Sequence, residues 1–376
     1  MRPTGALTMT DDPCTPDLSR RGVLRSALAT TAAISAPLLD VTSGAAHAAA
    51  NQGGADATGP ASVRGALHTA RGGTRIGALS DQSAVRTFTV GDTRLTYVVD
   101  GAMELDPAGF LPAVPAEYWQ AHPEALTGSG RIAASAGGVL VERGRRRLLI
   151  DVGLGGNVLS PSLGISRGGA LLHTLGALRV SPESIDTVAF THLHTDHTGL
   201  GFLRDRNQEL HKAFPRADYL VAGAEWEPFW QGEIKVGAPS WDGFMVPMSR
   251  VLQRFDDGDE VWPGVTALIT PGHSPGHTTY VVSASGGRRI LVLGDAFHTP
   301  AQMTHPEWPS GPDVDIEGVL HARTTLLKEL LAPRTYAFAF HFGDTVFGRV
   351  VRDDAGNVQW QPAPARELLP APVLLS

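Results

Sequence analysis

In the first part of the chain, hydrophobic and polar residues alternate in short runs that predict β-strands. Residues 85–90 and 95–99 form two such runs, and the Gly91-Asp92 step between them predicts a hairpin. Residues 138–141 and 147–150 predict a second antiparallel pair, joined at Arg143-Gly144. The N-terminal part of the folded region is therefore expected to be rich in β-structure.

Further along, short apolar runs each end at a polar side chain. Five runs share this pattern: residues 147–150 before Asp151, 185–190 before His192, 265–269 before His273, 290–293 before Asp295 and 335–340 before His341. Functional residues of sheet proteins gather where strands end. The pattern predicts that these side chains meet along one shared edge.

The segment from His192 to His197 contains three histidines and an aspartate within six residues. Alternate side chains of an extended segment share a face, so His192 and His194 can hold one ion. Thr195 then turns the chain, and the run that contains Gly199 is expected to open a helix. Asp196 and His197 would face a second ion, since imidazole and carboxylate both bind transition metals. A lone histidine is usually a surface or core residue, but this density predicts metal binding.

Together, these segments resemble the metallo-β-lactamase-fold hydrolases. The resemblance rests on Thr191–His197 followed by Gly199, on Thr270–His277 (TPGHSPGH), on Gly294-Asp295 and on the late His341. In layout the chain is most similar to exported methyl parathion hydrolases and N-acyl homoserine lactonases. The resemblance implies an α/β protein with the metallo-β-lactamase fold, a four-layer αββα sandwich of two mixed β-sheets flanked by helices.

The resemblance also implies a ligand set for two metal ions. His192, His194 and His273 would bind the first ion, Asp196, His197 and His341 the second, and Asp295 would bridge both. Asp151 matches the family's aspartate that orients a ligand histidine, and His277 matches a histidine that is usually structural. The implied cofactors are two divalent metal ions, with zinc expected and manganese, iron or cobalt as alternatives.

The expected reaction follows from such a pair of metals. A water that bridges two divalent cations has its pKa lowered toward neutrality and becomes a hydroxide nucleophile. Asp196 could help to move a proton. Related lactonases typically have a tyrosine three residues after the bridging aspartate, where it helps to polarise the carbonyl, but this chain has His298. An imidazole can act there as donor or proton carrier, although His298 could equally be a plain loop residue.

A competing serine-hydrolase motif is present at Gly272-His273-Ser274-Pro275-Gly276. That motif needs the backbone N–H after the serine as an oxyanion donor. Here the next residue is Pro275, which has no N–H. We therefore expect Ser274 to have no nucleophilic role.

The aromatic and methionine side chains between the metal segments allow two interpretations. Residues 219–259 contain Trp226, Phe229, Trp230, Trp241, Phe244, Met245 and Met248. They could line an apolar substrate pocket or simply pack a helix on the sheet. Four residues that closely follow Asp295 are better pocket candidates by proximity: Phe297, His298, Met303 and Trp308.

The N-terminal fifty residues predict export. Ser19–Arg25 resembles a twin-arginine motif, an Ala-, Ser- and Thr-rich stretch follows, and Ala46-His47-Ala48 offers small residues for cleavage. The apolar stretch is too short for a stable membrane span. We therefore expect a twin-arginine signal at 1–50, a linker or N-terminal arm at 51–84 and the hydrolase domain at 85–376. The only cysteine, Cys14, lies in the signal, so disulfides and thiol catalysis are not expected.

Composition narrows the partners. The chain has 376 residues, is 42% hydrophobic and carries a formal charge of −7, so it lacks the basic character of a nucleic-acid-binding protein. We expect a small-molecule substrate, no nucleic acid, no stable membrane insertion and a secreted, periplasmic or cell-surface location. The oligomeric state stays open, a homodimer included.

The predicted function is an exported dinuclear metal-dependent hydrolase of small esters, lactones or phosphotriesters. One alternative on the same fold is a mono-iron oxygenase similar to the persulfide dioxygenases. Another is a metal-binding protein without turnover.

Overall fold

The computed structural model describes residues 77–371. The predicted export signal, Cys14 and most of the predicted linker or arm lie outside the described residues. The described end of that segment contacts the domain: Ser83 and Ala84 are buried, and the Ala84 N–H donates a hydrogen bond to Asp344.

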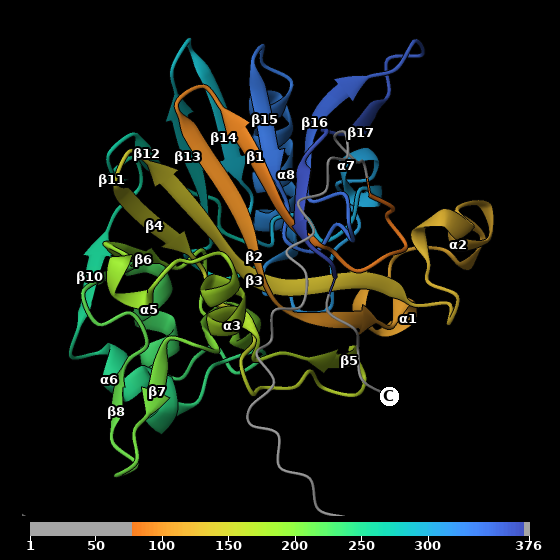
Figure 1. Cartoon of the computed structure of the whole chain (residues 1–376). Helices are drawn as coiled ribbons and strands as arrows, with labels where there is room; N and C mark the ends of the chain where they lie inside the picture. Colours follow the sequence, from red (N-terminus) through yellow and green to blue (C-terminus); the bar gives the residue numbers. More distant parts are fainter. Residues whose placement is uncertain (1–76, 372–376) are drawn as a thin grey trace, which may run out of the picture. The chain divides into compact units, whose positions relative to one another are not determined.

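Eighteen strands and eight α-helices occur within residues 77–371 (Figure 1). The strands are β1 (Val85–Val90), β2 (Thr93–Leu105), β3 (Ile132–Arg143), β4 (Arg146–Ile150), β5 (Gly164–Arg167), β6 (Thr187–Ala189), β7 (Phe202–Arg204), β8 (Leu210–Lys212), β9 (Asp218–Ala222), β10 (Leu252–Phe255), β11 (Glu260–Trp262), β12 (Val265–Ile269), β13 (Thr278–Ala284), β14 (Arg288–Val292), β15 (Thr335–Phe338), β16 (Phe347–Arg352), β17 (Val358–Pro362) and β18 (Arg366–Leu369). The helices are α1 (Pro107–Phe110), α2 (Ala116–Ala121), α3 (Leu171–Ala177), α4 (Thr195–Thr198), α5 (Gly223–Trp230), α6 (Val246–Met248), α7 (Ala301–Thr304) and α8 (Ile316–Leu330). Two 3₁₀ helices lie at Pro123–Ala125 and Pro182–Ser184, and a π-helix lies at Trp241–Met245.

The strands form two mixed sheets. The first has the order β10-β9-β6-β4-β3-β2-β1-β18, with β5 paired to β2, and the second has the order β11-β12-β13-β14-β15-β16-β17. Strands β7 and β8 form a separate hairpin. Within the first sheet β4, β6, β9 and β10 run parallel, as do β14 and β15 within the second, whereas the other pairs are antiparallel.

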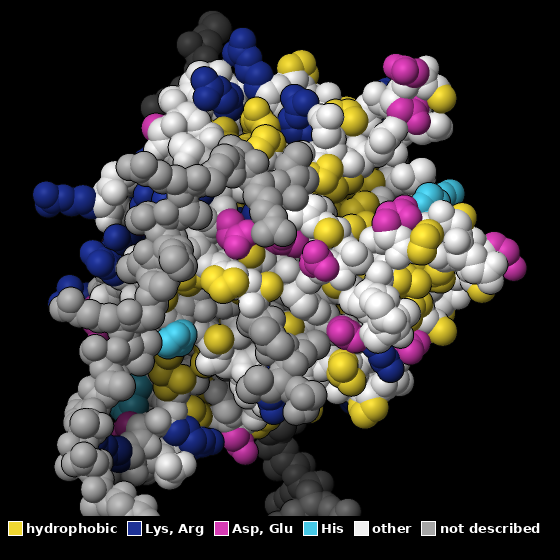
Figure 2. Space-filling model, turned by 45° about the vertical axis from the view of Figure 1, so that its right-hand side comes forward, with side chains coloured by type: hydrophobic (Ala, Val, Ile, Leu, Met, Phe, Trp, Pro, Cys, Tyr) yellow, Lys and Arg dark blue, Asp and Glu magenta, His cyan; other side chains and the backbone are white. Residues whose placement is uncertain are grey.

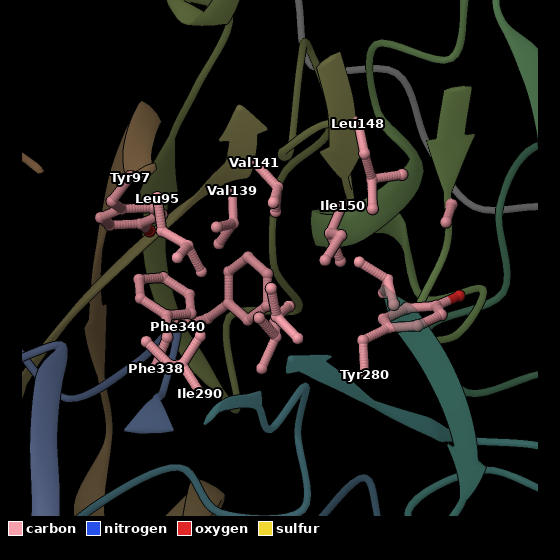
Figure 3. Packing of buried hydrophobic residues seen from close by; sticks show 14 of the residues in the cluster. Leu95, Tyr97, Val139, Val141, Leu148, Ile150, Tyr280, Ile290, Phe338 and Phe340 are labelled. Atoms are coloured by element: carbon pink, nitrogen blue, oxygen red, sulfur yellow. The ribbon is translucent and has the colours of Figure 1, made fainter. Parts of the chain in front are cut away.

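The main core lies between the two sheets (Figure 3). Leu95, Tyr97, Val139 and Ile150 of the first sheet face Tyr280, Ile290 and Phe338 of the second. Burial of such alternating side chains is the main favourable contribution to packing two sheets face to face.

Helices cover the outer faces. Leu171 and Leu175 of α3 and Trp226 of α5 pack with Leu149 and Tyr219 on the outer face of the first sheet. Leu326 and Leu330 of α8 pack with Leu291 and Ala337 on the outer face of the second sheet. This arrangement confirms the predicted four-layer αββα sandwich.

The predicted strands are found, with shorter ends where the polar residues begin. The first hairpin turns at Gly91 and the second at Gly144, which have φ of 59° and 61°. Regular pairing in β6 stops at Ala189 and in β15 at Phe338, before the predicted ends at 190 and 340. The expected helix near Gly199 is wrong in position: α4 spans only Thr195–Thr198, and Gly199 ends it as the C-cap.

The aromatic stretch between the metal segments belongs largely to the core. Trp226 and Phe229 of α5 are buried in the core cluster that packs on the outer face of the first sheet, together with Phe244, Met245 and Met248. Phe297 and Met303 are likewise buried beneath α8, so they are core residues and not pocket walls. None of the helices formed by residues 77–371 has the length and apolar character needed to cross a bilayer.

Figure 2 shows one face of the molecule, on which acidic and basic side chains both occur and hydrophobic side chains form small groups between them.

Candidate metal centre

The polar side chains that follow the five predicted strands lie close together. Asp151 follows β4, the segment His192–His197 follows β6, His273 follows β12, Asp295 follows β14 and His341 follows β15. The first two segments come from the first sheet and the other three from the second. The centre therefore lies where the ends of both sheets meet.

One group consists of His192, His194 and His273. One ring nitrogen of each lies within 4.8 Å of the others, and all three residues are buried. His194 Nδ1 lies 2.9 Å from His273 Nε2. Three imidazole nitrogens at this separation match the ligand number of a zinc site that keeps one position open.

A second group consists of Asp196, His197, Asp295 and His341. Nε2 of His197 and Nε2 of His341 each lie 3.2 Å from Asp295 Oδ1. The Asp196 carboxylate lies 3.6 and 3.7 Å from the same two nitrogens. The predicted second set of ligands is thus assembled around one carboxylate oxygen of Asp295.

The other oxygen of Asp295 faces the first group. Asp295 Oδ2 lies 3.5 Å from His273 Nε2 and 3.8 Å from His192 Nε2. The two oxygens of one carboxylate therefore point into two different groups of ligands. Gly294 makes this placement possible: it adopts φ of 55°, and a Cβ there would lie 2.4 Å from His277 Nε2.

Several buried polar atoms of the centre have no hydrogen-bond partner. They include His192 Nε2, His194 Nε2, His197 Nε2 and Asp295 Oδ1. Unpaired buried polar groups are rare because each costs about 1–3 kcal/mol, and they call for an unseen partner such as an ion. The imidazole and carboxylate donors fit divalent transition metals.

The pKa values of two histidines in the first group suit metal binding. Burial lowers the pKa of His192 and of His194 well below the usual histidine range, so both rings are neutral with a free lone pair. Burial alone would raise the pKa of Asp295, but the neighbouring His197 and His341 lower it well below its usual range. Asp295 is therefore an ionised carboxylate.

Asp151 contacts a histidine of the second group, as the family resemblance implies. Its Oδ2 accepts a hydrogen bond from His197 Nδ1 at 2.8 Å, and it also accepts from the Thr191 N–H and hydroxyl. Asp151 adopts φ of 61°, a left-handed conformation that is uncommon outside glycine and costs energy. This strained position lets the carboxylate fix the ring of His197.

Sequence reasoning missed two buried acids that contact the ligand segments. Glu225 in α5 accepts hydrogen bonds from the Leu193 N–H, the Ser274 hydroxyl and the Gly276 N–H. Asp313 accepts a hydrogen bond from His273 Nδ1 at 2.7 Å. An acid in the first turn of the helix after an apolar strand was a weak signal for Glu225, but nothing in the local sequence marks Asp313.

His298 lies at the edge of the centre. Its Nε2 is 3.2 Å from Asp295 Oδ2, and its Nδ1 is buried without a partner. The ring of Phe110 meets it edge-on at 5.0 Å. Both His298 and Asp196, the two predicted catalytic residues, are therefore close to the predicted ligands, and the Asp196 side chain is the more exposed, at 14%.

Ser274 and His277 have supporting contacts. The Ser274 hydroxyl donates to Glu225, so it is not paired with a histidine base. His277 accepts a hydrogen bond from the Asp295 N–H at 2.9 Å through Nε2. Burial and the neighbouring His273 lower the pKa of His277 to about 3, which keeps this acceptor unprotonated.

An open groove of about 490 Å³ lies elsewhere, over the outer face of the first sheet near Arg94, Arg147 and Arg366. Glu142 in its wall already pairs with Arg94 and Arg147. None of the seven predicted ligands lines this groove. The chemistry-bearing residues are gathered in the buried cluster instead.

Comparisons with known proteins agree with this geometry. The chain is 26% identical over 173 residues to the N-acyl homoserine lactonase AttM of Agrobacterium fabrum, covering 43% of this chain and 57% of that protein. It is 29% identical over 119 residues to an N-acyl homoserine lactonase of Bacillus cereus, covering 31% of this chain and 41% of that one. The chain thus spans about half the length of the curated relatives it matches.

Solved structures show the same fold. AidC, a dizinc quorum-quenching lactonase, superposes with a TM-score of 0.63 at 21% identity, over 76% of this chain and 99% of that one. The hydrolase AbOPH gives 0.62 at 22% identity with the same coverage. The Metallo-beta-lactamase superfamily matches residues 138–341, more than half of the chain and every predicted ligand. This protein belongs to the metallo-β-lactamase superfamily.

Proposed function

We propose that this protein is an exported, dinuclear metal-dependent hydrolase that cleaves small, fairly apolar esters, lactones or phosphotriesters. The observation that carries the proposal is Asp295, whose two carboxylate oxygens face two separate groups of buried ligands. A centre for one ion would not require seven converging ligands. The two-group arrangement therefore favours the hydrolase over the mono-iron alternative.

Each group would hold one ion, with zinc as the expected metal. His192, His194 and His273 would hold the first, Asp196, His197 and His341 the second, and Asp295 both. Two divalent cations at such a centre lower the pKa of a shared water and polarise a carbonyl or phosphoryl oxygen. The chain's own contribution is to fix the ligands and exclude bulk water, because all but Asp196 are buried.

Asp196 is suited to proton transfer. It belongs to the second group, yet it is the most accessible of the seven ligands. A carboxylate that touches both the centre and solvent can accept a proton from the attacking water and pass it to the leaving group.

His298 is suited to contacting the substrate oxygen. Because Nε2 donates to the Asp295 carboxylate, the unpartnered Nδ1 can accept a hydrogen bond or a proton once a substrate is present. Phe110 packs against the ring and limits its rotation. His298 would thus take the place of the tyrosine that is typical of the lactonases.

Exposed apolar side chains near the first group support an apolar substrate. Val236 is 54% exposed and precedes Gly237, which lies directly over the His194 ring. Val314 is 42% exposed, and its N–H donates to the carbonyl oxygen of Gly272, next to His273. Apolar groups beside a catalytic centre favour substrates with an acyl, alkyl or aryl part.

Export is proposed from the sequence alone. The twin-arginine-like segment Ser19–Arg25 and the small residues near Ala48 support it. A twin-arginine route carries folded proteins, which suits an enzyme that collects its metals before export.

The test combines metal analysis with a substrate panel. The purified protein is expected to contain two ions per chain and to hydrolyse at least one class among aryl esters, lactones and phosphotriesters. Asp295→Ala should lose at least one ion and nearly all activity, because it removes a ligand from both groups. Asp242→Ala is the matched control, since Asp242 is exposed and belongs to neither group of ligands.

The proposal fails if Asp295→Ala keeps both ions. One iron per chain would favour the oxygenase, and two ions without turnover on any substrate would favour a metal-binding protein.

A further inference from the structure

The two groups of ligands have separate supports. Asp151 contacts His197 of the second group, and Asp313 contacts His273 of the first, at 2.8 and 2.7 Å between ring Nδ1 and carboxylate. Asp313 comes 40 residues after His273 in the chain, in the segment between α7 and α8. Its side chain is fully buried. Neither carboxylate reaches the histidine of the other group through a hydrogen bond.

Asp313 is itself held in place from several sides. Its oxygens accept hydrogen bonds from the Ser310 N–H at 2.7 Å and from the Ser310 hydroxyl at 2.8 Å. Arg323 of α8, also fully buried, places Nη2 3.3 Å from Asp313 Oδ2. With this many partners, the carboxylate has a fixed position relative to the ring of His273.

Arg323 also contacts the loop that carries Asp295, so it connects that loop to Asp313. Its Nε donates to the carbonyl oxygen of Ala296, which directly follows Asp295, at 2.6 Å. Within residues 77–371, by contrast, no lysine or arginine contacts Asp151. The first group is thus backed by a carboxylate paired with a cation, and the second by a carboxylate without one.

A carboxylate that accepts the Nδ1–H of a histidine fixes its tautomer and makes its other nitrogen a stronger ligand. For His273, the free nitrogen is Nε2, the atom that faces Asp295 and His194. We propose that Asp313 is the positioning residue of the first ion, and that it sets the affinity of this ion separately from that of the second. The inference rests on the proposed function, because it requires two ions.

The experiment measures both metal dissociation constants by competition with a chromophoric chelator. In Asp313→Asn, one of the two constants should rise by about 10–100-fold while the other stays near the wild-type value. In Asp151→Asn, the other dissociation constant should rise instead, and in the double variant both should rise. Asp315→Asn is the matched control, because Asp315 caps α8 two residues away without touching a ligand.

Three outcomes would overturn the inference. They are unchanged dissociation constants in Asp313→Asn, a rise of the same dissociation constant in both single variants, and an equal rise in Asp315→Asn. Circular dichroism and melting of the metal-free proteins report whether each variant folds. Should Asp313→Asn not fold, Ser310→Ala is the second variant, because it removes only the hydroxyl donor to Asp313. It should raise the same dissociation constant to a smaller extent. No change of that constant in Ser310→Ala would also overturn the inference. A wild-type chain that holds fewer than two ions would instead contradict the proposed function.

Discussion

At the scale of single residues, most histidines of the centre have both ring nitrogens assigned. Nδ1 of His192 contacts the Thr191 hydroxyl, that of His197 contacts Asp151, that of His273 contacts Asp313 and that of His341 contacts the Ser135 carbonyl oxygen. In all four, Nε2 is left facing the centre. Fixed tautomers of this kind prepare the site before an ion arrives.

His298 provides a test at this scale. Replacing His298 with Phe keeps a planar ring beside Phe110 but removes both nitrogens. We expect kcat/KM on esters and lactones to fall by about 100-fold with the metal content unchanged, because a proton acceptor beside the reacting groups is lost. Steady-state kinetics with metal analysis checks this.

The matched variant is His298→Gln, which retains a hydrogen-bond donor and an acceptor and should lose less activity. Unchanged kinetics in His298→Phe on both substrate types would make His298 a plain loop residue.

Ser274 gives the opposite expectation. Ser274→Ala removes a buried hydrogen bond to Glu225, worth about 1 kcal/mol of stability. Turnover should remain close to that of the unchanged protein, as measured by kcat/KM and by thermal melting. An inactive but folded and metal-loaded Ser274→Ala protein would revive a serine mechanism.

At the scale of elements, helix α5 joins the two loops that carry the first group. Glu225 Oε1 accepts from the Leu193 N–H at 2.9 Å, and Oε2 accepts from the Ser274 hydroxyl and the Gly276 N–H at 2.8 Å. Leu193 lies between two ligand histidines, and Ser274 follows the third. A single buried side chain thus sets the distance between the loop after β6 and the loop after β12.

Replacing Glu225 with Gln should disturb this connection. In either orientation of the amide, its NH₂ group faces a backbone N–H, so that a buried donor is left unsatisfied at a cost of about 1–3 kcal/mol. We expect a lower melting temperature and weaker binding of one ion. Glu227→Gln is the control on the same helix, because Glu227 is 45% exposed and pairs with the exposed Arg254.

A melting temperature and metal affinity equal to those of Glu227→Gln would show that Glu225 does not hold the loops together. Circular dichroism should show the same secondary structure in both variants.

The sequence predicts strand positions and the ligand set better than it predicts the buried acids that hold the ligand loops. The ligands follow apolar strands directly, as His273 follows β12, so local pattern and spacing identify them. Asp313 and Glu225 reach the centre only through tertiary packing, 40 and 32 residues away in sequence from the groups they contact. The position of the helix at Gly199 was missed because ligand geometry, and not helix propensity, shapes that turn.

At the scale of the whole folded region, the ligands come from both sheets. His192, His194, Asp196 and His197 follow a strand of the first sheet, whereas His273, Asp295 and His341 follow strands of the second. Bound ions would therefore connect the two halves of the sandwich. The apolar core between the sheets is continuous without them, from Leu95 and Ile150 to Ile290 and Phe338 (Figure 3).

These two facts predict how metal removal affects stability. Because the core does not depend on the ions, chelation at 25 °C should leave the far-ultraviolet circular dichroism spectrum unchanged. Because ions bind the folded state, each one present at 100 times its Kd adds about 2.7 kcal/mol, or on the order of 4–5 °C in melting temperature. Chelated protein should therefore melt at a clearly lower temperature and recover when zinc is returned.

Asp295→Ala should show little of this recovery, since it lacks the carboxylate that faces both groups. An identical melting temperature with and without chelator would mean that no ion links the sheets, and loss of the spectrum on chelation would mean that the apolar core alone does not hold them.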